Sequence, residues 1–252
     1  MTIKITTSNC DVKKPYAIEE LADSSIEIQL GFERILSTQS RNKFIDELKS
    51  EIQGELQKFD WIICGKIQLE IHWYLDKVER QETDKVGDLD NISKPLIDSL
   101  SGFNGVLIDD SQINSIHSTW INKSALLTDN IVRIFIHFNN DYTLEKKNLY
   151  FLQTNQAMYT PLNFDLTDAD NLKDIKLFME VSKFKTAMAS SFNSLNANVD
   201  SYLIYSEYKF HRTRLNGFDS KNIFIKEQFD QICKNKDINI DTILSSLNKA
   251  SS

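Results

Sequence analysis

Residues 87–113 have the sequence GDLDNISKPLIDSLSGFNGVLIDDSQI, which places two acidic pairs on either side of a short helical pattern. The first pair is Asp88 and Asp90, and the second is Asp109 and Asp110. Between them, apolar residues recur at helical spacing, and a turn containing two glycines follows. Four carboxylates in this arrangement are hard to explain as ordinary surface, so we expect this segment to form the active site.

The segments around this stretch predict an α/β (α+β) domain with a mixed sheet. Pro95 is tolerated in the first turn of a helix, which predicts that the central helix begins near Asn91. Alternating apolar and polar residues predict strands, and helical spacing predicts one further helix. The predicted strands cover residues 26–32, 66–75, 112–121 and 130–138, and the further helix runs from 40 to 59. The order strand, helix, strand, helix, strand, strand favours one compact domain over residues 25–140.

The remaining segments differ in character from this domain. Residues 1–24 show weak periodicity and are expected to form an N-terminal arm, and the polar residues 139–148 are expected to be a linker. Residues 148–252 are expected to form a mainly helical C-terminal extension. Its predicted helices begin near residues 171, 220 and 241, while residues 199–210 are compatible with either a helix or a strand.

The composition of the 252-residue chain favours a folded protein that is not a general nucleic-acid coat. Hydrophobic residues make up 41% of the chain, enough for a core, and the net charge is -7. Residues 151–252 contain 12 basic and 12 acidic residues, so the whole negative charge lies in the first 150 residues. Part of that excess is the acidic segment itself, and bound divalent cations would neutralise some of it.

Several signals favour a cytoplasmic protein. No apolar run approaches the length of about 20 residues that a membrane helix needs. The first residues have no apolar export signal, and the three cysteines lie far apart without zinc-site spacing. We therefore expect no membrane association and reduced thiols.

The acidic residues suit phosphodiester hydrolysis assisted by Mg²⁺, with Mn²⁺ as a substitute, because magnesium binds oxygen ligands. Asp88 and Asp90 are two apart in an extended lead into the helix and are expected to point the same way. Asp109 or Asp110 can complete the cluster if the following strand pairs beside the helix start. Lys94 follows Asp90 by one helical turn and can neutralise charge on a phosphate. A bland alternative is that both acidic pairs only cap helices or turns.

With these motifs, the chain resembles the RusA-type Holliday junction resolvases. The resemblance is carried by the run from Asp88 to Lys94, by the helix that contains Asp98, and by the corner from Asp109 to Gln112. It covers about residues 26–138, including the order of the elements. It implies a RusA-like fold and a homodimeric, magnesium-dependent endonuclease that nicks four-way DNA junctions symmetrically in recombination and repair. Such proteins are bacterial or phage-type intracellular enzymes.

By this resemblance, the catalytic residues are three magnesium-binding carboxylates and one lysine: Asp88, Asp90, Asp110 and Lys94. Asp109 is a further metal-ligand candidate, and Asn91 and Gln112 are supporting residues. Members of the family are often short and basic, whereas this chain is acidic and carries an extension. Four-way DNA remains the expected substrate, with other branched or single-stranded DNA as alternatives.

Two other classes of function remain open. One is a catalytically silent RusA-like module that binds branched DNA or a protein partner. The other is a different magnesium-dependent phosphoryl or nucleotidyl transferase, although the chain has no glycine-rich phosphate loop.

Some further residues have both a functional and a structural interpretation. Glu70 and His72 share the polar face of a strand and can approach the acidic cluster, or they can simply face solvent. His117 and His137 are expected to be structural. In the extension, Lys209, Arg212 and Arg214 lie among aromatic residues and suit DNA binding, as do three lysines on one helical face, Lys173, Lys176 and Lys183. The alternative is a solvated basic surface over an aromatic core.

Overall fold

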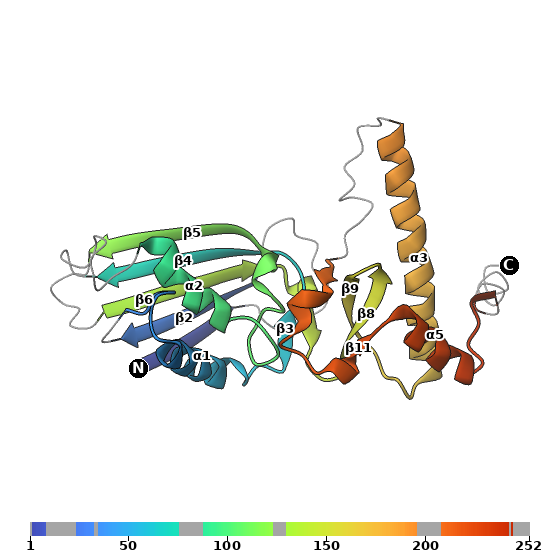
Figure 1. Cartoon of the computed structure of the whole chain (residues 1–252), viewed down its shortest axis with the longest axis horizontal. Helices are drawn as coiled ribbons and strands as arrows, with labels where there is room; N and C mark the ends of the chain where they lie inside the picture. Colours follow the sequence, from blue (N-terminus) through green and yellow to red (C-terminus); the bar gives the residue numbers. More distant parts are fainter. Residues whose placement is uncertain are drawn as a thin grey trace. The chain divides into compact units, whose positions relative to one another are not determined.

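The structure is a computed structural model, and it describes residues 2–8, 24–32, 35–75, 88–122, 130–195, 208–241 and 243. The chain divides into two compact units, Met1–Lys146 and Lys147–Ser252. Both are drawn in Figure 1, and each is described by itself below.

The first unit is built on a five-stranded mixed sheet with the order β1-β2-β6-β4-β5. Its strands are β1 (Thr2–Ser8), β2 (Ser24–Phe32), β4 (Ile67–Leu75), β5 (Ile113–Asn122) and β6 (Asn130–Phe138). All neighbouring strands are antiparallel except β4 and β5, which are parallel. The chain passes from β4 to β5 through a helix, and this connection carries the acidic segment.

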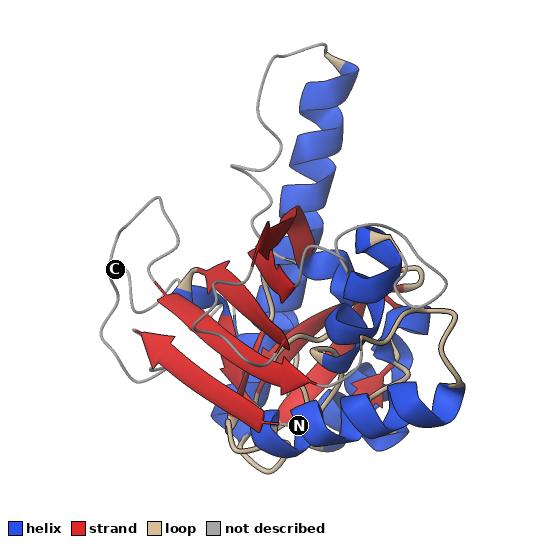
Figure 2. Ribbon diagram, turned by 90° about the vertical axis from the view of Figure 1, so that its left-hand side faces the viewer, coloured by secondary structure: helices blue, strands red, loops and turns tan. Residues whose placement is uncertain are grey.

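Two helices, α1 (Asn42–Leu56) and α2 (Leu89–Ser99), pack on one face of this sheet (Figures 1 and 2). Every second residue of β2, β4 and β6 is buried beneath them, as the alternating sequence predicts. The helices contribute five buried residues to the same core: Ile52, Leu56, Ile92, Leu96 and Ile97. The predicted mixed sheet and α+β class are therefore confirmed.

The predicted order of strands and helices is confirmed from β2 to β6, but the flanking segments differ from expectation. Instead of an irregular arm, the first residues form β1, which pairs with β2 along its whole length; residues 9–23 lie outside the described part. Instead of a linker, residues 140–145 form a short 3₁₀ turn, η3 (Asn140–Tyr142), and β7 (Thr143–Glu145). Strand β7 pairs with β3 (Trp61–Ile63), which the sequence did not reveal. These strands are too short for their periodicity to be recognised, and only pairing defines them.

The second unit combines a four-stranded sheet with two helices. The predicted long helix is present as α3 (Ala169–Ser194). The helix predicted from residue 220 begins only at Lys226, as α5 (Lys226–Asn235), because residues 220–224 form a 3₁₀ turn and a short strand instead. The sheet was not predicted; its order is β10-β9-β8-β11. Its strands are β8 (Leu149–Asn155), β9 (Met158–Asn163), β10 (Phe210–His211) and β11 (Ile223–Phe224), and two 3₁₀ turns, η4 (Arg212–Leu215) and η5 (Ser220–Asn222), lie between the last two strands. The undecided stretch 199–210 and the helix predicted from residue 241 lie mostly outside the described residues.

Helix α3 is the longest helix within the described residues and runs without interruption over 26 residues (Figure 2). It carries several charged side chains, among them Asp170, Lys176 and Lys183. Neither α3 nor any other helix in the described ranges has both the length and the apolar character needed to cross a membrane.

Candidate active site

The connection from β4 through α2 to β5 decides where the two acidic pairs lie. Because β4 and β5 are parallel neighbours, α2 must run back from the end of β4 to the start of β5. Asp88 directly precedes α2, whereas Asp110 opens the short 3₁₀ turn before β5 and contacts Lys94 in the middle of the helix. The second pair therefore lies beside Lys94, which follows Asp90 by one helical turn.

Asp88 is the N-cap of α2 and is held there by hydrogen bonds. Its Oδ1 accepts the backbone N–H of Asn91 at 3.3 Å and also the side-chain N–H of Asn91. The helix begins at Leu89, two residues earlier than predicted, so Asp90 belongs to its first turn. Asp88 therefore lies outside the helix, in an extended backbone conformation, whereas Asp90 lies inside it. Both side chains are exposed.

Pro95 lies inside α2 and is buried. Its missing N–H explains why Thr38, which is distant in the sequence, contacts this helix. A proline has no N–H, so the carbonyl group four residues earlier, that of Asn91, lacks its helical partner. This carbonyl instead accepts the backbone N–H of Thr38 at 3.0 Å. The hydroxyl of Thr38 also donates to Oδ1 of Asn91 at 2.6 Å. The amide of Asn91 is therefore oriented so that its NH₂ group faces Asp88.

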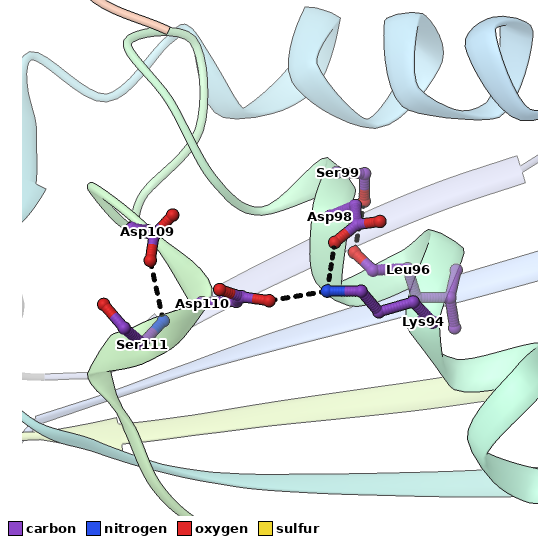
Figure 3. A network of polar contacts seen from close by, with 7 residues as sticks. All are labelled: Lys94, Leu96, Asp98, Ser99, Asp109, Asp110 and Ser111. Atoms are coloured by element: carbon purple, nitrogen blue, oxygen red, sulfur yellow. Dashed lines mark hydrogen bonds and ion pairs between the residues drawn. The ribbon is translucent and has the colours of Figure 1, made fainter. Parts of the chain in front are cut away.

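Lys94 joins the two acidic parts of the segment through ion pairs (Figure 3). Its Nζ lies 2.5 Å from Oδ2 of Asp110 and 2.7 Å from Oδ1 of Asp98, which is one helical turn further along α2. Burial of Lys94 lowers its pKa, but the hydrogen bonds and charges of Asp110 and Asp98 outweigh that effect and leave the pKa raised. Lys94 is therefore charged at neutral pH and neutralises two carboxylates at once.

The corner from Asp109 to Gln112 is fixed by a buried amide. Gln112 is completely buried, and its Oε1 accepts the backbone N–H groups of Ile108 and Asp109 at 2.7 and 3.1 Å. Its Nε2 donates to the carbonyl groups of Ile63 and Gly65 at 2.9 and 2.7 Å. Asp109 caps the following 3₁₀ turn, η2 (Asp110–Gln112), by accepting the N–H of Ser111 at 3.0 Å, as Figure 3 shows. Gln112 thus ties the acidic corner to β3 and to the residues before β4.

The turn between α2 and the corner depends on its glycines. Gly102 has a φ of 96°, which side-chain-bearing residues rarely adopt. A Cβ atom at Gly105 would lie 2.0 Å from the carbonyl oxygen of Leu100. The backbone N–H groups of Val106 and Leu107 both donate to that carbonyl, at 2.9 and 3.0 Å. The turn is therefore tightly closed, and it returns the chain to the later part of α2.

The carboxylates have the right chemistry for magnesium, but they do not surround one point. Within the described ranges, no three side chains among Asp, Glu, His and Cys are close enough together to hold a metal ion. Asp110 is paired with Lys94, and Asp88 caps α2. The donor atoms therefore fit Mg²⁺, whereas their present arrangement does not form a coordination shell for it.

Other candidates lie outside this segment. Glu70 lies 3.5 Å from His72 and 3.6 Å from His137, so these residues contact one another on the sheet. The thiol of Cys64 donates to the carbonyl of Tyr142, and burial, opposed only in part by a backbone hydrogen bond, raises its pKa to about 12. This thiol is therefore not a nucleophile near neutral pH.

The basic residues of the second unit have mixed surroundings. Each of the three lysines predicted to share one face of α3 is in an ion pair, with Asp170, Asp230 and Glu180 for Lys173, Lys176 and Lys183 respectively. Lys209 lies 3.5 Å from the hydroxyl of Ser182. Arg212 and Arg214 lie in η4, where Arg214 is exposed and Arg212 is half-buried.

Two contacts of the site were not predicted from the sequence. Asp98 was noted only as part of the resemblance, although it follows Lys94 by four residues and helical spacing was a signal that the two side chains meet. Thr38 lies 53 residues before Asn91, and no local pattern links them. The missing N–H of Pro95 was the only hint that another segment must approach Asn91.

Comparison with known families assigns the first unit. No individually curated protein matches the chain. Residues 28–137 match the family model described as endodeoxyribonuclease RusA, and this range runs from within β2 to within β6 and contains both helices and the acidic segment. The domain that holds the candidate site is therefore similar to the RusA family of endodeoxyribonucleases.

Proposed function

We propose that this chain is a magnesium-dependent endonuclease that hydrolyses phosphodiester bonds in four-way or other branched DNA. The observation that carries the proposal is the contact between Lys94 and Asp110, at 2.5 Å. It brings the two acidic motifs of the RusA-like domain together across a helix and a turn. It also places a cation among carboxylates, as catalysis on a phosphate requires.

The proposed roles follow the chemistry of each side chain. Asp88, Asp90 and Asp110, with Asp109 nearby, would supply oxygen ligands to the metal. Magnesium, when bound, would supply charge neutralisation and a more acidic water. Lys94 would stabilise negative charge on the phosphate. Asn91 orients Asp88, and Gln112 fixes the backbone of the corner.

The biological setting is also part of the proposal. We infer that the protein acts inside the cell as a homodimer, because a four-way junction has two strands to be nicked symmetrically and each site cuts one strand. The reaction would serve recombination and repair.

A cleavage assay tests this function. The full chain is incubated with a synthetic four-way junction, a flap, a duplex and a single strand, first with Mg²⁺ and then with EDTA. We expect paired nicks in the junction that need the metal and that Asp90→Asn abolishes without loss of DNA binding. Asp46→Asn is the matched control, since Asp46 is an exposed carboxylate on α1. Binding without cleavage under Mg²⁺ or Mn²⁺ would instead identify a catalytically silent DNA-binding module.

The second unit is proposed to add contacts to the DNA backbone through Lys209, Arg212 and Arg214. Neutralising Arg212 and Arg214 together should weaken binding to all sequences and flatten its dependence on salt by a slope of about 2 in a plot of log affinity against log salt concentration. An unchanged slope in a gel-shift titration would exclude this contact. Lys221→Gln is a suitable control, because Lys221 is exposed and already paired with Asp219 at 2.9 Å.

A further inference from the structure

The sheet of the first unit has a second face, opposite to helices α1 and α2. Along the neighbouring strands β4 and β6, buried side chains point toward the helices and alternate with half-buried or exposed ones on this second face (Figure 1). Five side chains with rings gather there: His72 and Tyr74 from β4, Phe135 and His137 from β6, and His117 from the edge strand β5. Three of the four histidines of the chain thus share one surface.

Four of these rings form a continuous row across three strands, which we call the ring row: His117, His72, Phe135 and His137. The centroids of successive rings lie 6.4, 5.2 and 6.5 Å apart. The planes of the last two rings are parallel to within 5°. The side chain of His137 is 34% exposed, and His117 at the sheet edge is exposed. Contacts between the rings hold the ring row in place, and its outer side remains accessible.

Polar and charged groups surround the ring row, and they do not suit an apolar partner. The guanidinium of Arg133 lies 5.6 Å from the ring centroid of Tyr74 and 3.7 Å from the carboxylate of Glu27. Glu70 lies beside two histidines of the ring row, and its side chain is 43% exposed. The buried centre of a protein–protein interface is usually depleted of charged residues. A partner with flat rings and hydrogen-bonding edges therefore fits this surface better than another protein surface.

We propose that the ring row is a binding site for the unpaired bases of single-stranded DNA. Every base has a flat face that stacks on aromatic side chains, whatever the sequence. An open sheet with rings on its central strands is a recurring platform for unpaired nucleotides. Arg133 beside the ring row can donate to a phosphate or a base edge, and Glu70 can accept from a base amino group. DNA is chosen over RNA because the domain is similar to endodeoxyribonucleases.

This site goes beyond the proposed function. It lies on the face of the sheet opposite to α2 and shares no residue with the acidic segment, and it rests on the proposed function only for the choice of DNA as the partner. In a duplex the bases are stacked on one another and their faces are closed to a protein. The ring row would therefore favour branched molecules that carry an unpaired arm over a closed duplex.

The charges around the ring row predict how this binding responds to salt. Arg133 is paired with Glu27, and Glu70 adds a negative charge, so the surface offers few contacts to phosphates. Stacking releases no counter-ions, whereas each phosphate contact does. Removal of a ring should therefore lower the affinity for single-stranded DNA and leave its salt dependence unchanged. Removal of Arg212 and Arg214 should instead change the salt dependence.

The test measures the fluorescence anisotropy of a labelled thymidine oligonucleotide of about 15 residues, bound by the full chain in EDTA. We expect Phe135→Ala to weaken binding about tenfold, and Phe135→Leu to weaken it nearly as much, because leucine is apolar but has no ring. Phe135→Tyr retains the ring and should stay within about twofold of the wild type. His72→Gln should weaken binding about fivefold. Circular dichroism checks that each variant is folded.

A second readout locates the DNA. An oligonucleotide with 5-iodouracil, which cross-links to neighbouring aromatic side chains under ultraviolet light, should be found by mass spectrometry on peptides of β4 or β6. Phe184→Ala is the matched control, because Phe184 is an aromatic residue of the second unit with 66% exposure. This variant should bind the oligonucleotide like the wild type.

Several outcomes would overturn the ring row as a DNA site. They are unchanged binding by Phe135→Ala, wild-type binding by Phe135→Leu, an equal loss for a duplex of the same length, or tighter binding of the matching RNA. Light scattering that shows a dimer for the wild type and a monomer for Phe135→Ala would identify the face as an interface between two copies instead. Loss of junction cleavage with intact oligonucleotide binding would count against the proposed function and leave the ring row standing.

Discussion

The start and the middle of helix α2 are held by different forces. At its start, Asp88, Asn91 and Thr38 are joined by hydrogen bonds of which only one partner, Asp88, carries a charge. In the middle of the helix, Lys94 is held by two carboxylates. Hydrogen bonds to an amide fix direction, because donors and acceptors differ, whereas a point charge accepts partners from many directions. The first part of the site is therefore held by directional hydrogen bonds and the second part by charge.

The corner that contacts Lys94 is supported by the buried amide of Gln112, and removing this amide should have the largest effect. Gln112→Leu would leave two buried N–H groups and two buried carbonyl groups without the amide that they contact. We expect the free energy of unfolding to fall by about 3 kcal/mol or more, measured by urea denaturation. Gln53→Leu is the control, because the amide of Gln53 makes a single bond to the carbonyl of Ser101 and should cost about 1 kcal/mol. Equal losses would show that the corner does not depend on Gln112.

The second-largest effect is expected at Asp110, and it distinguishes this carboxylate from its neighbour Asp109. Asp110→Asn should lower the rate of junction cleavage about 100-fold, because it removes the charge that faces Lys94. Asp109→Asn should have a much smaller effect, because an amide oxygen can still accept the N–H of Ser111. Single-turnover cleavage rates measure both. A larger loss for Asp109→Asn would reverse the assignment of these two residues.

The third effect concerns the start of α2. Thr38→Val keeps the shape of Thr38 but removes the hydroxyl that donates to Asn91. The amide of Asn91 is then free to rotate away from Asp88, and we expect cleavage to slow about fivefold, with a loss of about 1 kcal/mol in unfolding free energy. Thr38→Ser retains a hydroxyl and should restore both values. If Val and Ser variants behave alike, the start of α2 does not need this contact.

The smallest effect is electrostatic and depends on pH and salt. Because the pKa of Lys94 is raised in the folded state, its ion pairs stabilise the protein fully below the ordinary lysine pKa of about 10.4, and this contribution is lost as the pH rises through the raised value. Asp98→Asn should therefore lower the unfolding free energy at pH 7 by less than about 1 kcal/mol.

The loss of unfolding free energy caused by Asp98→Asn should shrink at high salt and at pH values above the raised pKa of Lys94. Urea denaturation at low and high salt, and at pH 7 and above the raised pKa of Lys94, measures it. A loss that does not depend on salt would mean that Asp98 acts through packing and not through charge.

The sequence by itself determined the α+β class, the strands β2, β4, β5 and β6 and the position of the acidic segment, because these depend on local periodicity and on residue type. Strands β3 and β7 and the sheet of the second unit could not be predicted, since such short strands are defined by their partners. The start of α2 was misplaced, because Pro95 is tolerated inside the helix where Thr38 replaces its missing hydrogen bond.

Only the tertiary structure decided which side chains of the candidate site meet. The parallel pairing of β4 and β5 forces α2 to run back toward the start of β5, so the corner contacts Lys94 in the middle of the helix. The contacts of Thr38 with Asn91, and of Gln112 with β3, join segments about 50 residues apart. No local pattern encodes such contacts, because they depend on the packing of the whole sheet.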